Sequence, residues 1–88
     1  MKIDDVKEKL LEMGISEISY FEGVNFDDAI IGYTEDGRVV YSYSLMVEYL
    51  KEKEGMSEEE ALDWLEYNTI RTVPYMGKSS PIIVYDIF

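Results

Sequence analysis

Apolar side chains recur every three or four residues in three segments of the chain, which predicts three amphipathic helices. The first follows a cap at Asp4 and ends at Gly14, because glycine readily takes the left-handed conformation found after many helices. The second follows a cap at Ser44 and ends at Gly55. Helical periodicity therefore organises the N-terminal part and the middle of the chain.

The third helix has the clearest start. Ser57 is followed three residues later by Glu60, which is the spacing of a capping box. The helix is expected to run to about Ile70, and Pro74 marks a point beyond its end. Residues 71–80 are predicted to form a loop.

Four runs rich in β-forming residues predict four strands. They are Glu17–Phe21, Ala29–Thr34, Val39–Tyr43 and residues 82–87. The last run is apolar on both sides until Asp86, so it is expected to be central in the sheet, or next to central, rather than at an exposed edge.

Asp36 and Gly37 lie between the second and third strands. Asp-Gly favours a two-residue hairpin turn with positive φ at both central positions. This turn predicts a register in which Thr34 lies opposite Val39, and each residue before Thr34 lies opposite the next residue after Val39. One hairpin face would carry Ile31, Tyr33 and Val40, and the other Ile30, Val39, Tyr41 and Tyr43.

Neither hairpin face is polar, so both are expected to need cover. The helices can cover one face. The termini, the long loop or another molecule must cover the second, which makes a homodimer one prediction. The predicted fold class is α+β: a single domain over residues 1–88, in the order α-β-β-β-α-α-β, with a mostly antiparallel four-stranded sheet packed by helices.

Composition narrows the function classes. The 88 residues include 19 acidic and 8 basic side chains, for a net charge of −11, and contain neither histidine nor cysteine. The commonest general base, the thiolate nucleophile and the usual transition-metal ligands are therefore missing. The charge argues against direct binding of nucleic acid. We expect a non-enzymatic protein with no cofactor and no metal.

The N-terminal residues are polar and periodic, unlike a signal peptide, and the apolar runs are too short for a membrane span. No membrane association is expected, and the expected compartment is the cytoplasm.

The acidic side chains allow two interpretations. The simpler one is that they form caps, turns and solvated helix faces. The alternative is an acidic surface that imitates a nucleic acid and inhibits a host DNA- or RNA-binding protein. A carboxylate-dependent enzyme is a second alternative. The residues that would form the acidic surface are Asp27, Asp28, Glu48, Glu52, Glu58, Glu59, Asp63 and Glu66.

The segment from Tyr67 to Tyr85 contains no acidic residue. By its spacing Asn68 shares the apolar face of the third helix, where its amide would bond the backbone of the following loop or line a recognition site. Tyrosine, arginine and methionine are enriched at interface hot spots. The candidate binding residues are Asn68, Arg71, Tyr75, Met76 and Lys78. The plainer interpretation pairs the cations with nearby carboxylates and packs Tyr75 into the core.

The stretches DDAIIGYTEDGRVVYSYSLMVEYL and EEEALDWLEYNTIRTVPYMGKSSPIIVYD resemble a family of small acidic proteins from prophages and integrative elements of Gram-positive gut bacteria. The similarity covers roughly residues 27–86, and the helix at the N-terminus lies outside it. The family has no assigned activity, so the resemblance implies no catalytic residue. It implies a mobile-element setting and a host or phage protein as the partner of an interaction or accessory protein.

Overall fold

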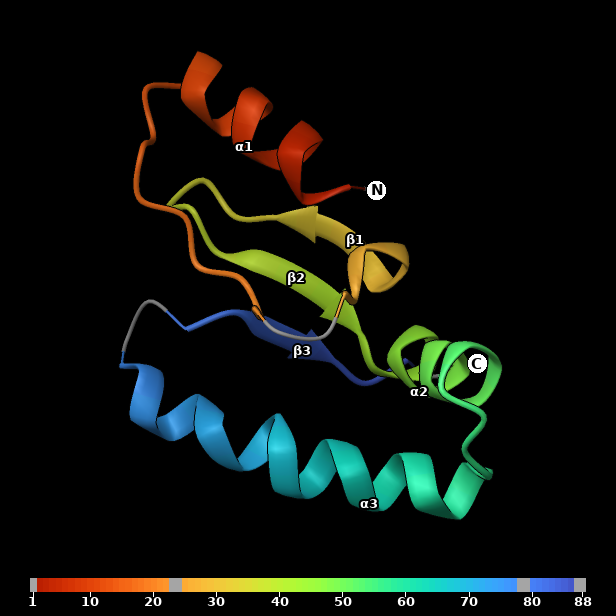
Figure 1. Cartoon of the computed structure of the whole chain (residues 1–88). Coiled ribbons are helices and arrows are strands. Elements are labelled where there is room, and N and C mark those ends of the chain that lie inside the picture. The colour runs from red at the N-terminus through yellow and green to blue at the C-terminus, as the bar shows by residue number, and fades with distance from the viewer. Residues whose placement is uncertain (1, 23–24, 78–79, 87–88) are drawn as a thin grey trace.

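The structure is a computed structural model that describes residues 2–22, 25–77 and 80–86. In these ranges the chain forms three α-helices, two short 3-10 helices and three strands (Figure 1). Their bounds are α1 Ile3–Glu12, η1 Asp27–Ala29, β1 Ile30–Tyr33, β2 Val39–Ser42, α2 Tyr43–Lys53, α3 Glu58–Asn68, η2 Ile70–Met76 and β3 Ile82–Val84. The chain is an α+β domain.

The sheet has three strands in the order β1-β2-β3, and it is mixed. β1 pairs antiparallel with β2, and β2 pairs parallel with β3. The predicted four-stranded, mostly antiparallel sheet is therefore wrong. Two parallel neighbours need a long crossover connection, and α2, α3 and η2 supply it between β2 and β3.

The segment predicted as the first strand does not join the sheet as a strand. Only Ser19 forms a bridge, opposite Arg38 at the start of β2: its N–H donates to Gly37 O at 2.9 Å, and its C=O accepts from Val39 N at 3.0 Å. From Val40 onward the same edge of β2 pairs with β3. The segment has no backbone partner left there, and the N–H of Phe21 instead donates to the Tyr41 hydroxyl at 3.1 Å.

β3 lies at the edge of the sheet, and β2 is the central strand. The prediction that residues 82–87 lie at or next to the centre of the sheet rather than at an exposed edge is wrong for the described part, 82–86, because β3 is an edge strand. Val84 is 39% exposed and Tyr85 is 58% exposed. Apolar residues on both sides of this strand therefore reflect an uncovered surface rather than a doubly buried strand.

The hairpin turn also differs from the prediction. Thr34 N donates to Arg38 O at 2.8 Å and closes a three-residue loop, in which only Gly37 has positive φ, at 89°. A three-residue loop that ends in a left-handed glycine is a common hairpin connection. The register is shifted by one from the prediction, with Tyr33 opposite Val39. An irregularity between Ile30 and Gly32 then leaves Ile31 without a register partner in β2.

The end of α1 agrees with the prediction, and its start does not. Ile15 N donates to Leu10 O and Gly14 N to Leu11 O, both at 2.9 Å, which is the Schellman arrangement around a left-handed glycine. Lys2 rather than Asp4 occupies the N-cap position, and no side chain caps this helix.

The cap of α2 is Ser42, not Ser44. The Ser42 hydroxyl accepts a hydrogen bond from Leu45 N at 3.3 Å. For α3 the predicted capping box is confirmed, since Ser57 and Glu60 each bond the other's backbone N–H. The predicted loop that begins at residue 71 is instead the 3-10 helix η2, which contains Pro74.

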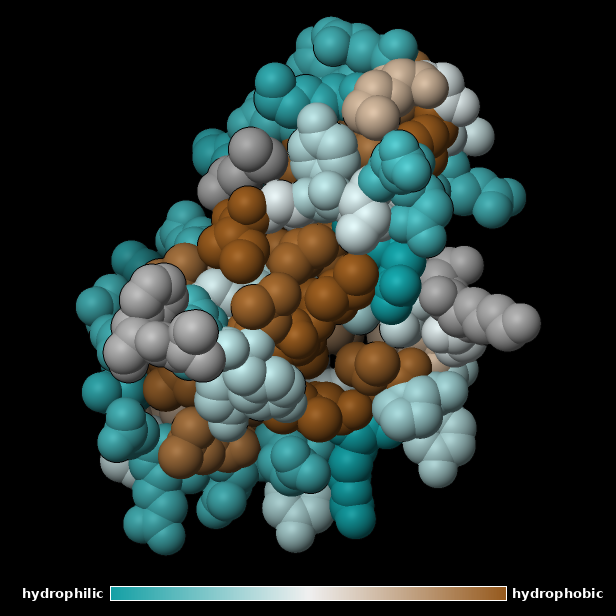
Figure 2. Space-filling view, turned by 180° about the vertical axis from the view of Figure 1, so that it is seen from behind, coloured by the Kyte–Doolittle hydropathy of each residue, from teal (hydrophilic) through white to brown (hydrophobic). Residues whose placement is uncertain are grey.

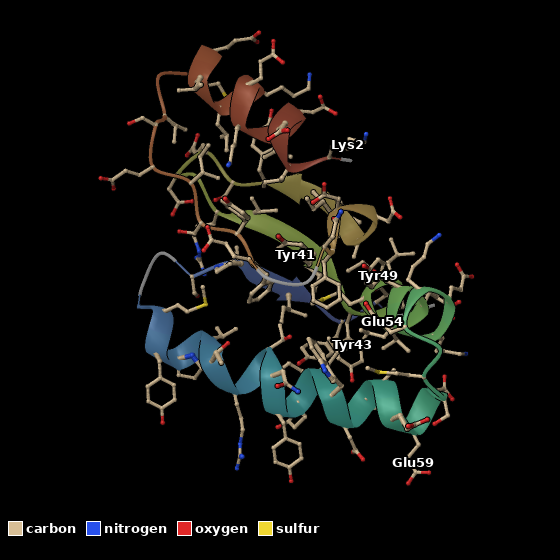
Figure 3. All side chains as sticks on the ribbon, in the orientation of Figure 1. Lys2, Tyr41, Tyr43, Tyr49, Glu54 and Glu59 are labelled. Atoms are coloured by element: carbon tan, nitrogen blue, oxygen red, sulfur yellow. The ribbon has the colours of Figure 1, made fainter. Side chains whose placement is uncertain are left out.

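Helices cover one face of the sheet. Val39 and Tyr41 of β2 are buried on that face among Leu10, Leu50 and Leu65. α1 lies on the β1 side of the sheet and α3 on the β3 side (Figure 1), and Tyr43 lies between the sheet and α3 (Figure 3). None of the helices in the described ranges is long and apolar enough to cross a membrane.

The opposite face remains open. Side chains alternate between faces along a strand, so Val40 and its register partner Ile82 point away from the core. Val84 shares this face, and Ile31 is 52% exposed. Figure 2 shows apolar surface across the middle of the molecule seen from this side. We call these four residues the open sheet face: Ile31, Val40, Ile82 and Val84.

Candidate binding surface

η2 contributes to two hollows through different residues. Thr72 and Met76 line the first, together with Trp64 and Asn68 of α3. Val73 lines the second. Because Pro74 fixes φ near −65° and removes a donor, it fits a short 3-10 segment better than a longer α-helix. The local sequence therefore ends α3 and turns the chain into a ridge between the two hollows.

We call the first hollow the aromatic hollow. It has a volume of about 300 Å³. Its polar lining consists of Glu22, Asn68, Thr69 and Thr72. Its aromatic lining consists of Tyr20, Phe21, Phe26 and Trp64.

Contacts around the aromatic hollow fix its walls. The rings of Phe26 and Trp64 meet edge to face with centroids 6.2 Å apart, and Phe21 packs on Tyr41 at 5.0 Å. Lys7 Nζ donates to the Tyr20 hydroxyl at 3.1 Å, and this hydrogen bond raises the pKa of Lys7. Tyr20 and Phe21 are thereby held against α1 on one side and against the sheet on the other.

The second, apolar hollow has a volume of about 310 Å³ and lies between η2 and β3. It is lined by Ile70, Val73, Pro74, Ile83 and Tyr85. Val84 lies between the last two of these in sequence but points to the open sheet face, because side chains alternate along a strand. The second hollow and the open sheet face therefore lie on either side of the edge strand β3. The ring of Tyr85 packs on Tyr43 with centroids 4.7 Å apart.

The spacing predicted that Asn68 lies on the apolar face of α3, and this prediction is wrong. Its side chain is exposed, and Nδ2 donates to the backbone oxygen of Trp64 at 3.0 Å, one turn earlier in α3. It does not bond the backbone of the following segment through any described contact. The helix ends at Asn68 itself, so the residue lies at the rim of the aromatic hollow rather than in the core.

The other candidates around η2 are exposed. Tyr75 is 91% exposed, so the prediction that it packs into the core is wrong, and Met76 is 41% exposed. The Arg71 guanidinium lies over the ring of Tyr67 at 4.9 Å. Lys78 lies outside the described residues. The structure thus brings Asn68 and Met76 to one hollow and places Arg71 and Tyr75 on the ridge beside it.

Some of the acidic candidates also come together. Asp28 of η1 and Glu48 and Glu52 of α2 line a further hollow of about 260 Å³. The remaining candidates do not line it. Asp27 is half-buried in η1, and Glu58, Glu59, Asp63 and Glu66 are exposed along α3, with Glu59 pointing away from the domain in Figure 3. Over residues 2–22, 25–77 and 80–86, no group of three or more acidic side chains could hold a metal ion.

The aromatic lining was missed at the level of sequence. Tyr20 and Phe21 fall in a run that reads as a strand, and Trp64 falls on a helix whose inner face is defined by Ala61 and Leu65. The available signal was the density of aromatic residues on either side of the loop before η1, with Phe26 on its far side. That signal does not specify which helix these aromatic residues contact.

Comparison of the chain with protein families, with curated proteins and with solved structures finds no match in any of the three.

Proposed function

We propose that this chain is a non-enzymatic protein-interaction domain whose partner docks on η2 and reaches around the edge strand β3 to the open sheet face. The observation that carries the proposal is the exposure of Tyr75, 91% of whose surface is accessible on a ridge between two hollows. Tyrosine is enriched among interface hot spots, where such a side chain becomes buried in a pocket of the complex.

The surroundings of Tyr75 support the same use. Arg71 stacks on Tyr67, which is 63% exposed, and Met76 is partly exposed. These residue types are enriched at protein interfaces, whereas acidic residues are depleted there. The segment between Tyr67 and Tyr85 contains no acidic residue although the chain has a net charge of −11.

The open sheet face extends this surface beyond η2. Ile31 and Val84 expose 52% and 39% of their surface. Soluble monomers rarely expose large contiguous apolar patches, so such a patch often marks an interaction site. The resemblance to proteins of prophages and integrative elements supports a host or phage protein, met in the cytoplasm, as the partner.

The test compares two double variants that each truncate two exposed side chains. Arg71→Ala/Tyr75→Ala truncates the ridge, and Leu11→Ala/Met13→Ala truncates the C-terminal end of α1, on the β1 side of the sheet. Each tagged variant is used to capture proteins from a host lysate, and the captured proteins are quantified by mass spectrometry. The ridge variant is expected to lose the captured protein, and the α1 variant to retain it. Equal capture by both would show that η2 is not the docking site.

The grouping of Asp28, Glu48 and Glu52 favours a second candidate function, inhibition of a nucleic-acid-binding protein by an acidic surface. Binding of that kind weakens steeply with added salt. Glu48→Gln/Glu52→Gln should then abolish capture, and the ridge variant should not. If salt has little effect and the ridge variant alone fails, the acidic surface is not the docking site.

A homodimer is a further way to cover the open sheet face. Light scattering should then show a mass that rises with protein concentration, and Ile31→Lys should return it to that of one chain. A constant monomer mass for the unmodified protein over the same concentrations would exclude this assembly.

A further inference from the structure

The aromatic hollow combines aromatic walls with polar groups that can accept hydrogen bonds. Glu22 contributes a carboxylate, which when ionised only accepts. Nδ2 of Asn68 donates to the Trp64 carbonyl, so the amide oxygen remains for a ligand. The Thr72 hydroxyl gives its single proton to the Thr69 carbonyl at 2.6 Å, which leaves its oxygen as an acceptor.

A ligand that satisfies these groups must donate several hydrogen bonds and must tolerate aromatic surroundings. Cations meet both requirements, because aromatic faces attract positive charge and a carboxylate pairs with it. The net charge of −11 further favours a positive ligand over a negative one.

The chain itself already places cations on aromatic rings next to this site. Lys7 Nζ lies 4.6 Å from the centroid of the Tyr20 ring, which is part of the hollow's wall. Arg71 of η2 lies 4.9 Å from the Tyr67 ring. Among the residues that the structure describes, no lysine or arginine lines the hollow, Lys7 and Arg71 included, so its described lining presents a carboxylate and aromatic walls to a cation of the partner.

We propose that the aromatic hollow binds the guanidinium group of an arginine side chain presented by the partner protein, an inference that rests on the proposed function. A volume of about 300 Å³ is at the lower end for ligand sites and suits one side chain. Arginine fits better than lysine, because its planar group can stack on a ring while its fork of N–H donors reaches a carboxylate. The partner surface that meets η2 would then be basic around this anchor.

Trp64 provides a direct measurement, because it is the single tryptophan of the chain and lines the hollow. The intact protein is titrated with N-acetylarginine amide, and Trp64 fluorescence is followed at constant ionic strength. N-acetylcitrulline amide serves as the neutral analogue of nearly the same shape. The arginine derivative is expected to give a saturable change with a dissociation constant on the order of millimolar, as suits a single cation–π and carboxylate contact. The citrulline derivative should bind about fivefold or more weakly, because its hydrogen bonds carry no charge.

Two matched variants locate the effect. Glu22→Gln removes the carboxylate at the hollow, and Glu12→Gln removes an exposed carboxylate from the last turn of α1. Both lower the net negative charge by one, so a general electrostatic effect would change them equally. Weakening by Glu22→Gln alone supports the proposal. Equal responses to arginine and citrulline derivatives, or equal effects of the two variants, would overturn it.

The titration contains no partner protein, so its failure differs from a failure of the proposed function. If the ridge variant loses its captured protein but arginine does not bind, the docking surface stands and the arginine pocket is wrong. If arginine binds at Trp64 but the ridge variant captures normally, the pocket stands and the assignment of η2 is wrong.

Discussion

The Ser42 hydroxyl donates a hydrogen bond of 2.7 Å to the Asp86 carboxylate. Ser42 ends β2 and caps α2, and Asp86 follows β3, so one contact joins the ends of two parallel strands to the start of a helix. The same hydroxyl oxygen accepts from Leu45 N, and the other Asp86 oxygen accepts from Ser44 N at 3.4 Å. A carboxylate at this position also interacts favourably with the positive end of the helix dipole.

Ser42→Ala is therefore expected to lower the free energy of unfolding by about 1–3 kcal/mol, because it removes the cap and leaves both partners without their hydrogen bond. Chemical denaturation in urea measures this loss. Ser16→Ala is the matched control, since Ser16 is an exposed serine that follows α1. Its expected cost is below about 0.5 kcal/mol. Equal costs for the two variants would show that the Ser42 hydroxyl does not stabilise the fold.

A second prediction concerns the pH dependence that Asp86 introduces. The hydrogen bond from the Ser42 hydroxyl, with smaller contributions from Ser44, lowers the pKa of Asp86 below its ordinary value of 3.8. A lowered pKa in the folded state means that the stabilisation is present above pH 3.8 and is lost as the pH falls through the folded-state value. The difference in unfolding free energy between the unmodified protein and Asp86→Asn should therefore shrink between pH 5 and pH 2. A constant difference over that range would show that the charge of Asp86 contributes nothing.

Local signals predicted the helices well. The capping box at Ser57 and the glycine that ends α1 each depend on residues within one turn of each other, and such contacts can be identified from spacing alone. The predicted cap of α2 was two residues too late in the chain, because Ser42 and Ser44 are equally suitable by residue type. The choice between them depends on Asp86, which is 44 residues away from Ser42.

Local signals predicted the sheet poorly. Residues 17–21 have the composition of a strand, yet the edge of β2 that they would occupy is already paired with β3 from Val40 onward. An isolated apolar pattern does not reveal such competition for backbone partners. It also cannot show whether an apolar strand face is covered, and Val84 is on a face left open.

The candidate site divides in the same way. The segment around η2 became a candidate because it lacks acidic residues, and the structure exposes its Tyr75. The aromatic wall could not, because it joins residues 20–26 to α3 across about 40 positions of sequence. Asn68 failed for a local reason: its spacing continued the apolar stripe, but α3 ends at that residue.

A third prediction concerns Gly37, which has φ of 89° and is buried at the end of the hairpin loop. An added Cβ would overlap the backbone oxygen of Glu17. Gly37→Ala therefore combines backbone strain with a steric clash, and we expect a loss above about 2 kcal/mol. Gly14→Ala is the matched control, because Gly14 has φ of 83° but open space around its Cβ position. Its expected cost is about 1 kcal/mol. Equal losses for the two variants in thermal or urea unfolding would show that the contact with Glu17 has no energetic effect.

A fourth prediction tests the hydrogen bond that holds the 17–22 segment across the sheet. Tyr41 is 1% exposed, and its hydroxyl oxygen accepts from Phe21 N at 3.1 Å. Tyr41→Phe keeps the ring and its packing on Phe21 but removes this acceptor, so we expect a loss of about 1–3 kcal/mol at pH 7. Hydrogen exchange should show the Phe21 amide less protected in the variant. An unchanged exchange rate for that amide would mean that the Tyr41 hydroxyl does not hold the segment.

The last prediction follows from the ionisation of the same side chain. Burial raises the pKa of Tyr41 from 10.0 to about 12, and burial also raises the pKa of Tyr43. A raised pKa in the folded state means that the stabilisation is complete below pH 10 and is lost as the pH rises toward 12, because the unfolded chain ionises first. The advantage of the unmodified protein over Tyr41→Phe in urea unfolding should therefore decrease between pH 9.5 and pH 11.5. Tyr33→Phe is the control, because Tyr33 of β1 is only partly buried whereas Tyr41 is fully buried. A Tyr41→Phe difference that stays constant with pH would show that Tyr41 ionises as readily in the folded state as in the unfolded chain.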